Sequence, residues 1–310
     1  MNSRVSTRAG LLATVCSLFI LAAPAGAQAA ESQIASGASN ACAINSNSLA
    51  TCWGFNLDGG STIPTDLGTV KQISPGAFHT CALTTSDQVR CWGGEMYDNQ
   101  GQVNVPAGLG SAKQISSGAA HVCAIKTSNS TVVCWGANDS GQSTVPGTLG
   151  AAKQVEAGNK FTCAIKTSDS KVVCWGIKDY GQTTVPSSLG TVKQVNAGER
   201  NACAIKTSDS KVVCWGTYNA FGQRTVPSSL GAASKVESGG IATCAIKTST
   251  KKVVCWGKNN AGGSAPSTLG SVTQLSAGGS FMCAMKTTGN KIACWGNNSS
   301  GQTTVPSNFR

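Results

Sequence analysis

The 310-residue sequence is poor in charge, aromatic side chains and histidine: 12% of its residues are charged, 5% are aromatic and two are histidine. So few histidines argue against a histidine-based metal centre. The net charge of +11 is not gathered into dense basic runs, so we expect no nucleic-acid partner. The sequence also lacks G-x-S-x-G, H-E-x-x-H, phosphate-binding and calcium-loop motifs. We therefore expect no enzyme, no cofactor and no metal site.

Long apolar runs are missing as well, except near the start of the chain. Two arginines precede an apolar stretch of 13 residues, 11–23, and a small-x-small cleavage site ends at Ala29. This order is typical of a secretory signal peptide, and 13 apolar residues are too few to span a bilayer. We expect residues 1–29 to be removed and residues 30–310 to be secreted without a membrane span. The destination would be extracellular, or periplasmic in a Gram-negative host.

What the sequence does contain is a repeat. Every tryptophan lies in a Cys-Trp-Gly motif, and successive motifs are 39 to 43 residues apart. The motifs are centred on Trp53, Trp92, Trp135, Trp175, Trp215, Trp256 and Trp295. Each unit contains four short β-branched stretches broken by turn residues, such as KQVEAG, FTCAIK, KVVCWG and QTTVP in the fourth unit. Because one such unit cannot bury its own faces but a ring can, we predict an all-β, seven-bladed β-propeller with four-stranded blades over residues 30–310.

The cysteines of the predicted mature chain follow the same period and fall in pairs 10 or 11 residues apart. On a hairpin with a three- or four-residue turn, the two members of each pair face each other within disulfide range. Zinc sites need more closely spaced ligands, so in an exported chain we favour one disulfide per blade. The predicted pairs are Cys42 with Cys52, Cys81 with Cys91, Cys123 with Cys134, Cys163 with Cys174, Cys203 with Cys214, Cys244 with Cys255, and Cys283 with Cys294.

The repeated run of Cys-Ala-Ile-Lys, Cys-Trp-Gly and Gly-Gln-Thr-Thr-Val-Pro resembles the repeat of the regulator of chromosome condensation (RCC1-like) superfamily. The resemblance covers about residues 33–306 and implies the propeller fold. Among exported members, the Trp175-Gly176 and Gly181–Pro186 segments are similar to β-lactamase inhibitory protein II, a seven-bladed inhibitor of class A β-lactamases. That similarity implies binding to another exported protein, with a β-lactamase or a penicillin-binding protein as the candidate target.

Comparison of the units shows where binding residues are expected. If the four strands are named A to D from the axis outward, the A–B and C–D loops share one face, which we call the loop face. These loops differ between units, whereas the B–C and D–A connections hardly vary. Variable loops on a rigid scaffold are where binding residues gather. The candidates are Phe78, His79, Tyr97, Asp98, His121, Asp139, Lys160, Phe161, Lys178, Tyr180, Glu199, Arg200, Tyr218, Phe221 and Phe281.

These observations predict a secreted, non-enzymatic, monomeric protein that binds another protein with its loop face. Inhibition of that protein is what the similarity to β-lactamase inhibitory protein II adds. The contact would centre on Tyr97, Phe161, Tyr180, Tyr218 and Phe281, because tyrosine and phenylalanine are favoured interface anchors. For His79 and His121 a hydrogen-bonded structural role is the competing interpretation. The alternative function is a lectin-like or adhesive propeller that binds glycans. The opposite face carries most of the lysines, which is compatible with an anionic cell-surface polymer or with a merely solubilising surface.

Overall fold

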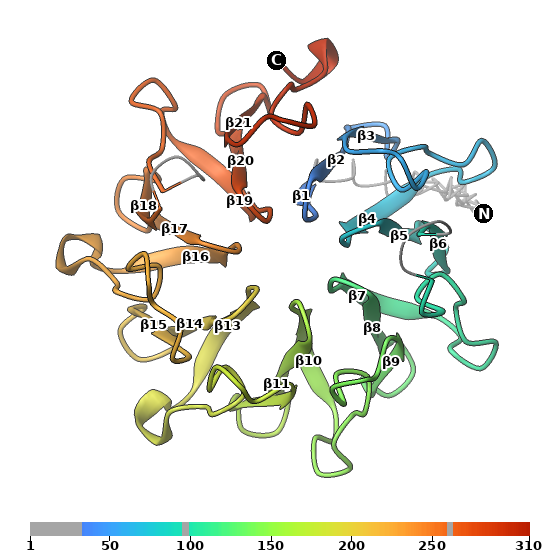
Figure 1. Cartoon of the computed structure of the whole chain (residues 1–310), viewed down its shortest axis with the longest axis horizontal. Coiled ribbons are helices and arrows are strands. Elements are labelled where there is room, and N and C mark those ends of the chain that lie inside the picture. The colour runs from blue at the N-terminus through green and yellow to red at the C-terminus, as the bar shows by residue number, and fades with distance from the viewer. Residues whose placement is uncertain (1–32, 95–98, 259–262) are drawn as a thin grey trace, which may run out of the picture.

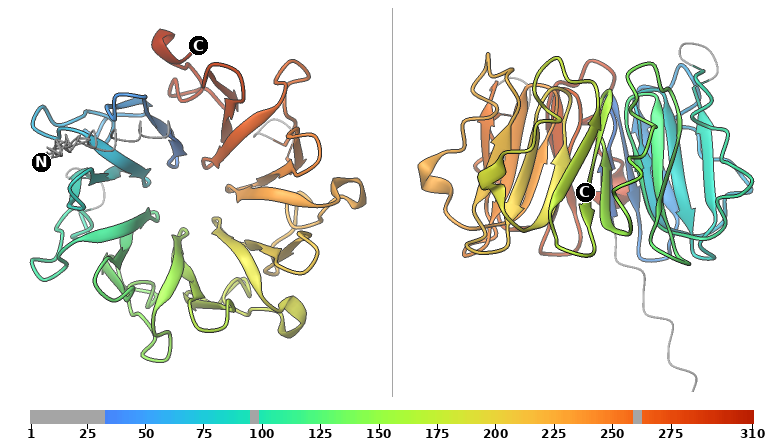
Figure 2. Two further views of the ribbon diagram at one scale, coloured as in Figure 1. Left: turned by 180° about the vertical axis from the view of Figure 1, so that it is seen from behind. Right: turned by 90° about the horizontal axis from the view of Figure 1, so that it is seen from below.

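The computed structural model describes residues 33–94, 99–258 and 263–310. In these ranges the chain forms seven antiparallel three-stranded sheets, which stand around a central axis as the blades of a propeller (Figure 1). Seen edge-on, the ring is a disc with loops on both faces (Figure 2). The prediction of an all-β, seven-bladed propeller is confirmed at this level. The predicted signal peptide lies outside the described residues.

Each blade uses three consecutive strands, A, B and C, and blades are numbered in chain order. The innermost A strands are β1 (Gln33–Ser36), β4 (Val70–Pro75), β7 (Ala112–Ser117), β10 (Ala152–Ala157), β13 (Val192–Ala197), β16 (Ala233–Ser238) and β19 (Val272–Ala277). The middle B strands are β2 (Asn40–Ile44), β5 (His79–Thr84), β8 (His121–Lys126), β11 (Phe161–Lys166), β14 (Ala202–Lys206), β17 (Ala242–Lys247) and β20 (Phe281–Lys286). The outer C strands are β3 (Ala50–Gly54), β6 (Val89–Gly93), β9 (Val132–Gly136), β12 (Val172–Gly176), β15 (Val212–Trp215), β18 (Val253–Gly257) and β21 (Ile292–Gly296).

Helix is limited to single turns of 3-10 helix in the described residues. These turns are η1 (Ser187–Leu189), η2 (Ser228–Leu230) and η4 (Ser307–Phe309). Each follows a proline, which fits the start of a helical turn because its missing N–H is not needed there. None of the helices in the described ranges is long and apolar enough to cross a membrane.

All seven predicted disulfides are present, one between the B and C strands of each blade. In blade 4, for example, Cys163 and Cys174 are register partners with their Cα atoms 4.1 Å apart. The Cα–Cα distance is 4.0–4.1 Å in every pair, the close spacing of directly opposed residues on antiparallel strands. The B-strand member is fully buried in each blade. The disulfides therefore tie each hairpin together at the edge of the core.

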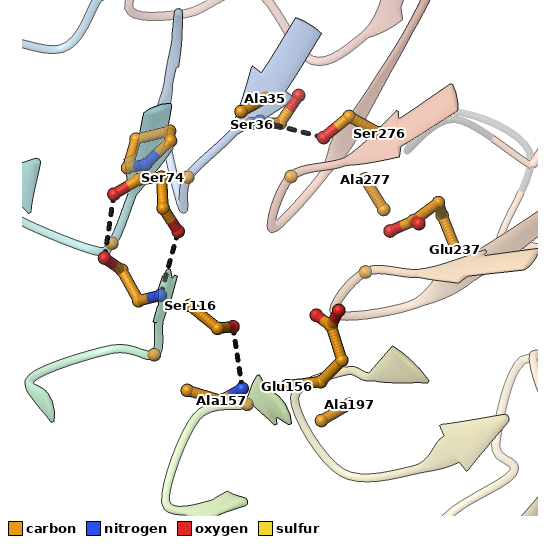
Figure 3. Close-up of a pocket in the computed structure, with 18 of the residues that line it drawn as sticks. Ala35, Ser36, Ser74, Ser116, Glu156, Ala157, Ala197, Glu237, Ser276 and Ala277 are labelled. Carbon is orange, nitrogen blue, oxygen red and sulfur yellow. Dashed lines mark hydrogen bonds between the residues drawn. The ribbon is translucent and has the colours of Figure 1, made fainter. Parts of the chain in front are cut away.

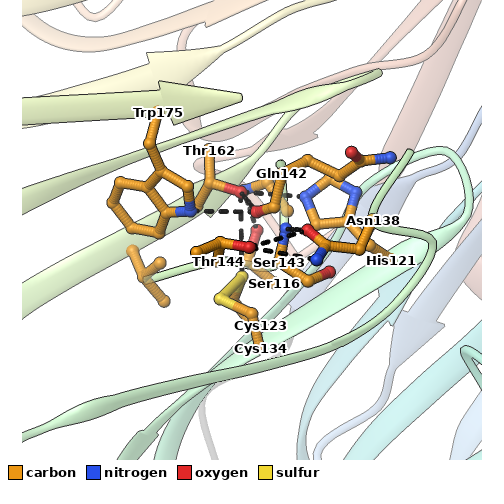
Figure 4. Close-up of a disulfide and its surroundings, with 12 residues drawn as sticks. Ser116, His121, Cys123, Cys134, Asn138, Gln142, Ser143, Thr144, Thr162 and Trp175 are labelled. Atoms are coloured by element: carbon orange, nitrogen blue, oxygen red, sulfur yellow. Dashed lines mark hydrogen bonds between the residues drawn. A yellow bond between two sulfur atoms is a disulfide. The ribbon is translucent and has the colours of Figure 1, made fainter. Parts of the chain in front are cut away.

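The fourth stretch of each unit is not a strand in the described residues, so the prediction of four-stranded blades is not met. In blade 3 the stretch turns back at once, because the Thr144 amide donates to the Gly141 carbonyl at 3.1 Å. The Gln142 side chain accepts the Ser140 amide at 2.8 Å, and Pro146 then lacks the N–H that a sheet ladder needs. The Gln142 carbonyl accepts the indole N–H of Trp175 in the next blade at 2.9 Å (Figure 4). The stretch thus joins neighbouring blades instead of widening one.

The hydrophobic core is divided into seven clusters, and each cluster fills the space between two neighbouring blades. Between blades 3 and 4, Ile125 and Val132 pack with Leu149, Val155 and Trp175. A repeated Pro-x-x-Leu segment supplies the leucine of six clusters, and Phe309 takes its place in the cluster between blades 7 and 1. Burial of these side chains is the main stabilising contribution, at ~25 cal/mol per Å² of apolar surface. Each blade therefore depends on its two neighbours to bury its apolar faces.

The ring closes by direct contacts between blade 7 and blade 1, with no strand exchanged between their described sheets. Trp53 donates its indole N–H to the Gln302 carbonyl at 3.0 Å, and its ring centroid lies 6.4 Å from that of Phe309. Around the axis, backbone hydrogen bonds of 3.0–3.4 Å join each A–B turn to the next. This circle returns from the Gly279 amide to the Ala38 carbonyl.

Candidate functional site

The A–B turns and the C–D loops meet on one face of the disc, as the sequence predicts. We keep the name C–D loop for the segment that joins the C strand to the fourth stretch of each unit. The A–B turn of one blade contacts the C–D loop of the preceding blade. Lys160 pairs with Asp139 at 2.8 Å, and the Phe78 ring lies 6.0 Å from the Phe55 ring. The loop face is therefore built from pairs of loops, each contributed by two neighbouring blades.

One group of these side chains forms a continuous contact across blades 4, 5 and 6. The guanidinium carbon of Arg200 lies over two tyrosine rings, 5.1 Å from the centroid of Tyr180 and 4.8 Å from that of Tyr218. Those two rings meet edge to face with centroids 6.0 Å apart. Tyr218 also contacts Phe221 at 6.5 Å, and the Lys258 ammonium lies 5.1 Å from the Phe221 centroid. We call these five residues the Arg200 cluster.

The Arg200 cluster is partly open to solvent. The Arg200 side chain is 38% exposed and Phe221 is 39% exposed, while Lys258 is exposed and the tyrosines are half-buried. Cation–aromatic contacts of this geometry hold an arginine in a fixed orientation while leaving donor groups at its edge. Glu199 is its nearest ionic neighbour, with 3.8 Å between carboxylate oxygen and Nε. Tyrosine, phenylalanine and arginine held in this way are typical of interface anchors.

Four of the predicted loop-face residues lie inside the molecule instead. His79, His121, Phe161 and Phe281 are fully buried, and each is the first residue of its B strand. The reason is the glycine three residues earlier, where a Cβ would collide with the ring of the buried residue. The A–B turn thus folds that ring inward, and these four side chains are not part of the exposed surface in this structure.

Burial sets the charge of both histidines. It lowers the pKa of His79 to about 3, with a further contribution from His121. Burial likewise lowers the pKa of His121 to about 4, against the opposing effect of Asp139. Thr162 donates to the Gln142 carbonyl at 2.9 Å, so its oxygen accepts from Nε2 of His121 at 2.9 Å (Figure 4). This chain of bonds is structural, because it joins blade 3 to blade 4 out of contact with solvent.

The remaining candidates stay on the surface or outside the described residues. Lys178 is exposed beside Tyr180, and Asp139 and Lys160 form their ion pair at the surface. The hydrogen bonds from Lys160 and Gln142 hold the pKa of Asp139 below its usual value. Tyr97 and Asp98 lie outside the described residues.

A second candidate site, which the sequence interpretation missed, is the axial cavity. It has a volume of about 710 Å³ and is lined by the A strands and the A–B turns of all seven blades. Six blades place a glutamine at the same position of the A strand, and blade 6 places Lys235 there. The glutamines are Gln33, Gln72, Gln114, Gln154, Gln194 and Gln274. The side-chain oxygen of each accepts a backbone N–H of the next blade at 2.9–3.1 Å.

A second ring of side chains lies two residues further along the A strands. Ser74, Ser116 and Ser276 accept a backbone N–H of the next blade at 2.8–2.9 Å (Figure 3). Asn196 does the same with its side-chain oxygen at 2.8 Å. The equivalent positions of blades 4 and 6 hold Glu156 and Glu237, whose carboxylates face the cavity in Figure 3.

Glu237 is ion-paired, whereas Glu156 is hydrogen-bonded to neutral side chains. Glu237 accepts from Lys235 at 2.8 Å and from Asn196 at 2.9 Å. Glu156 accepts from Gln154 at 2.9 Å and also from the Ser116 hydroxyl. Burial and the charge of Glu237 raise the pKa of Glu156 to about 7. Burial would lower the pKa of Lys235, but the two carboxylates raise it. The sequence signal for this site is the repeated glutamine, with its one replacement by lysine.

Neither site has the composition of a metal centre. In the described ranges no group of three or more histidine, cysteine, aspartate and glutamate side chains could hold a metal ion. Fourteen cysteines are committed to disulfides. The structure thus offers one exposed aromatic and cationic surface and one polar axial cavity.

Comparison with known proteins identifies the repeat. A model of the regulator of chromosome condensation (RCC1) repeat matches residues 70–102, 112–142, 152–182, 192–223 and 272–302, together just over half of the chain. A comparison with curated protein sequences gives no match.

Several solved structures share the fold. The entire ectodomain of the receptor kinase CR4 from Physcomitrella patens matches 85% of this chain and 72% of its own length, at 23% identity and a TM-score of 0.71. The CRINKLY WD40 ectodomain of the receptor kinase ACR4 from Arabidopsis thaliana matches 85% of this chain and 94% of its own, at 26% identity and a TM-score of 0.67. Yeast RCC1 (Prp20), solved bound to Kap60, matches 87% of this chain and 81% of its own, at 15% identity and a TM-score of 0.67.

Proposed function

This chain belongs to the regulator of chromosome condensation (RCC1) repeat family, and we propose that it is an exported, non-enzymatic protein that binds another protein through its loop face. The Arg200 cluster is the observation that carries the proposal. It combines three aromatic rings with two cations, from three neighbouring blades, on a rigid and disulfide-tied scaffold. Such residues are those that dominate the energy of protein interfaces.

Export is supported by the disulfides and by the sequence of the leader. Seven disulfides in one chain are typical of an oxidising compartment outside the cytosol. Two of the similar structures are receptor-kinase ectodomains. Residues 1–29 have the order of a signal peptide.

A single large contact fits the loop face better than a set of small sugar sites. A propeller with one glycan site per blade would repeat the same side chains around the ring. Here the aromatic and cationic contacts of the Arg200 cluster occupy one sector, blades 4 to 6. Blades 3 and 4 carry the Asp139–Lys160 ion pair instead. Unlike loops around one face favour one macromolecular partner.

The test is capture of a partner from the secreted and surface fraction of the producing organism. The bait proteins are the wild type, Tyr180→Ala/Tyr218→Ala, and a matched control on the opposite face, Lys171→Ala/Lys211→Ala. We expect one protein to be captured by the wild type and the control and lost with the tyrosine variant. Glycan-array binding that ignores the tyrosine variant would replace this proposal with the lectin function.

The similarity to β-lactamase inhibitory protein II extends the proposal to inhibition of the partner. Hydrolysis of a chromogenic cephalosporin by a purified class A β-lactamase, with and without the propeller, tests that extension. Unchanged hydrolysis would remove this enzyme class as the target and leave the binding proposal in place.

A further inference from the structure

We infer that the Arg200 cluster recognises a carboxylate, so that the partner presents an aspartate or glutamate side chain to it. This inference rests on the proposed function and adds the chemistry of the partner. It follows from the way Arg200 is held, from the donors that it keeps and from the charges around it.

Two tyrosines from neighbouring blades orient the guanidinium. Arg200 belongs to the A–B turn of blade 5, Tyr180 to the C–D loop of blade 4 and Tyr218 to the C–D loop of blade 5. The guanidinium carbon lies 5.1 and 4.8 Å from the centroids of the two rings, which are tilted by 68° to each other, so the cation is held between two aromatic rings. Cation–π contact of this kind leaves the N–H groups that do not point at the rings for other partners.

Those N–H groups are not saturated by the nearest carboxylate. The oxygen of Glu199 is 3.8 Å from Nε of Arg200, which is beyond hydrogen-bond distance. A guanidinium has five donors in a planar fork that matches the two oxygens of a carboxylate. The two rings already limit the rotamers of Arg200. Binding of a bidentate carboxylate would therefore cost little additional side-chain entropy.

The charges around the cluster favour an acidic partner over a basic one. Lys178 and Lys258 are exposed near the tyrosines and the phenylalanine, and with Arg200 they outnumber the two neighbouring carboxylates, Asp179 and Glu199. The Lys160–Asp139 pair at the side of this sector is neutral as a unit. An incoming carboxylate therefore meets an excess of positive charge next to apolar ring surface.

A defined peptide tests this inference without knowledge of the natural partner. The probe is an acetylated and amidated tetraglutamate peptide, and the matched control is tetraglutamine. Binding is followed at low ionic strength by NMR, from the Nε–H signal of Arg200 and the ring signals of the two tyrosines. Wild type is compared with Arg200→Ala, Arg200→Lys and the opposite-face control Lys171→Ala/Lys211→Ala.

We expect tetraglutamate, and not tetraglutamine, to shift these signals in a saturable way. Arg200→Ala should weaken the affinity at least tenfold. Arg200→Lys should weaken it several-fold although the charge is kept, because an ammonium lacks the fork. The lysine control should bind like the wild type. Since Arg200 also joins two loops, near-ultraviolet circular dichroism of each variant confirms that the fold is retained, and Arg200→Lys keeps the test valid if the alanine variant is disturbed.

Three outcomes would overturn the inference: equal shifts with tetraglutamine, no saturable shift of the Arg200 and tyrosine signals with tetraglutamate, or full affinity in both Arg200 variants. If the peptide fails in one of these ways while Tyr180→Ala/Tyr218→Ala still loses the captured protein, the binding proposal stands and only the acidic chemistry falls. If the peptide result holds but no protein is captured, the failure lies with the proposed function.

Discussion

The side-chain amide of Gln154 pairs with the backbone of Val195 in the next blade, accepting its N–H at 3.0 Å and donating to its carbonyl at 2.9 Å. The same two-bond pairing joins Gln72 to Ile115, Gln114 to Val155 and Gln194 to Val236. At the junction of blades 6 and 7 the position is Lys235, which has no acceptor and cannot make this pair. The ring thus has one junction that lacks the amide contact.

We predict that Lys235→Gln/Glu237→Ser, which copies the Gln114 and Ser116 of blade 3, raises the free energy of unfolding by about 1 kcal/mol. Gln194→Ala should lower it by ~1–3 kcal/mol, because it leaves the peptide group of Val236 without its partner. Guanidinium unfolding with the disulfides intact measures both. A double variant that is no more stable than the wild type would show that the lysine junction is not weaker.

Glu156 should make stability fall as pH rises. Its folded pKa of about 7 lies above the ordinary 4.5, because of burial and the charge of Glu237. Between these pH values the unfolded chain releases a proton that the folded chain keeps, so folding loses up to ~1.4 kcal/mol per pH unit. We predict that the Glu156→Ser variant, which has the residue found at the equivalent position of blade 3, is more stable than the wild type at pH 8. At pH 4 the two should be alike, and a gain that is equal at both pH values would contradict the assignment.

The buried histidines should have the opposite effect. The unfolded chain binds protons below the ordinary pKa of 6.5, whereas His121 stays neutral to about pH 4 and His79 to about pH 3. Stability is therefore lost as pH falls below 6.5. Blades 4 and 7 carry phenylalanine at the same position, so His79→Phe/His121→Phe is a matched replacement. We predict that it reduces the loss of unfolding free energy between pH 7.5 and 4.5 by up to ~5 kcal/mol. Identical acid profiles for the two proteins would refute this.

Each disulfide should stabilise its own blade. The bonds join cysteines only 10 or 11 residues apart, and loops of that size contribute ~2–3 kcal/mol in the chain-entropy model. We predict that Cys203→Ala/Cys214→Ala lowers the free energy of unfolding by about that amount and that full reduction causes cooperative loss of the fold. Mass spectrometry under non-reducing conditions should find none of the fourteen paired cysteines free, and free thiols at these positions would falsify the assignment.

Much of the architecture could be predicted because it depends on local spacing. Cys163 and Cys174 are partners because side chains alternate along a strand and a four-residue turn brings the two positions face to face. The tryptophans repeat with the blades, and the structure buries Trp175 between two of them. The prediction of a fourth strand was wrong because the Gln142 side chain accepts the Ser140 amide and Pro146 lacks the N–H that a sheet ladder needs. The β-branched composition of the stretch, on which the prediction depended, contains no information on either effect.

The site was less predictable because it depends on contacts between blades. Phe161 has the residue type of an interface anchor, but its place three residues after Gly158 turns it into the core. The axial glutamines repeat along the sequence, but only the closed ring shows that their side of the A strand faces another blade. The proximity of Tyr180, Arg200 and Tyr218 follows from loops of two blades meeting, which the sequence places on one face without giving their distances.

The central claim is that the partner contacts the Arg200 cluster, and site-specific photo-crosslinking tests it most directly. A photoreactive phenylalanine analogue replaces Phe221, which is 39% exposed, and in a second protein it replaces Ser208 in the exposed B–C turn of the opposite face. Both proteins are irradiated in the secreted and surface fraction of the producing organism. The account predicts one crosslinked protein from position 221 and none from position 208. Crosslinking from position 208 alone, or to glycan at both positions, would contradict it.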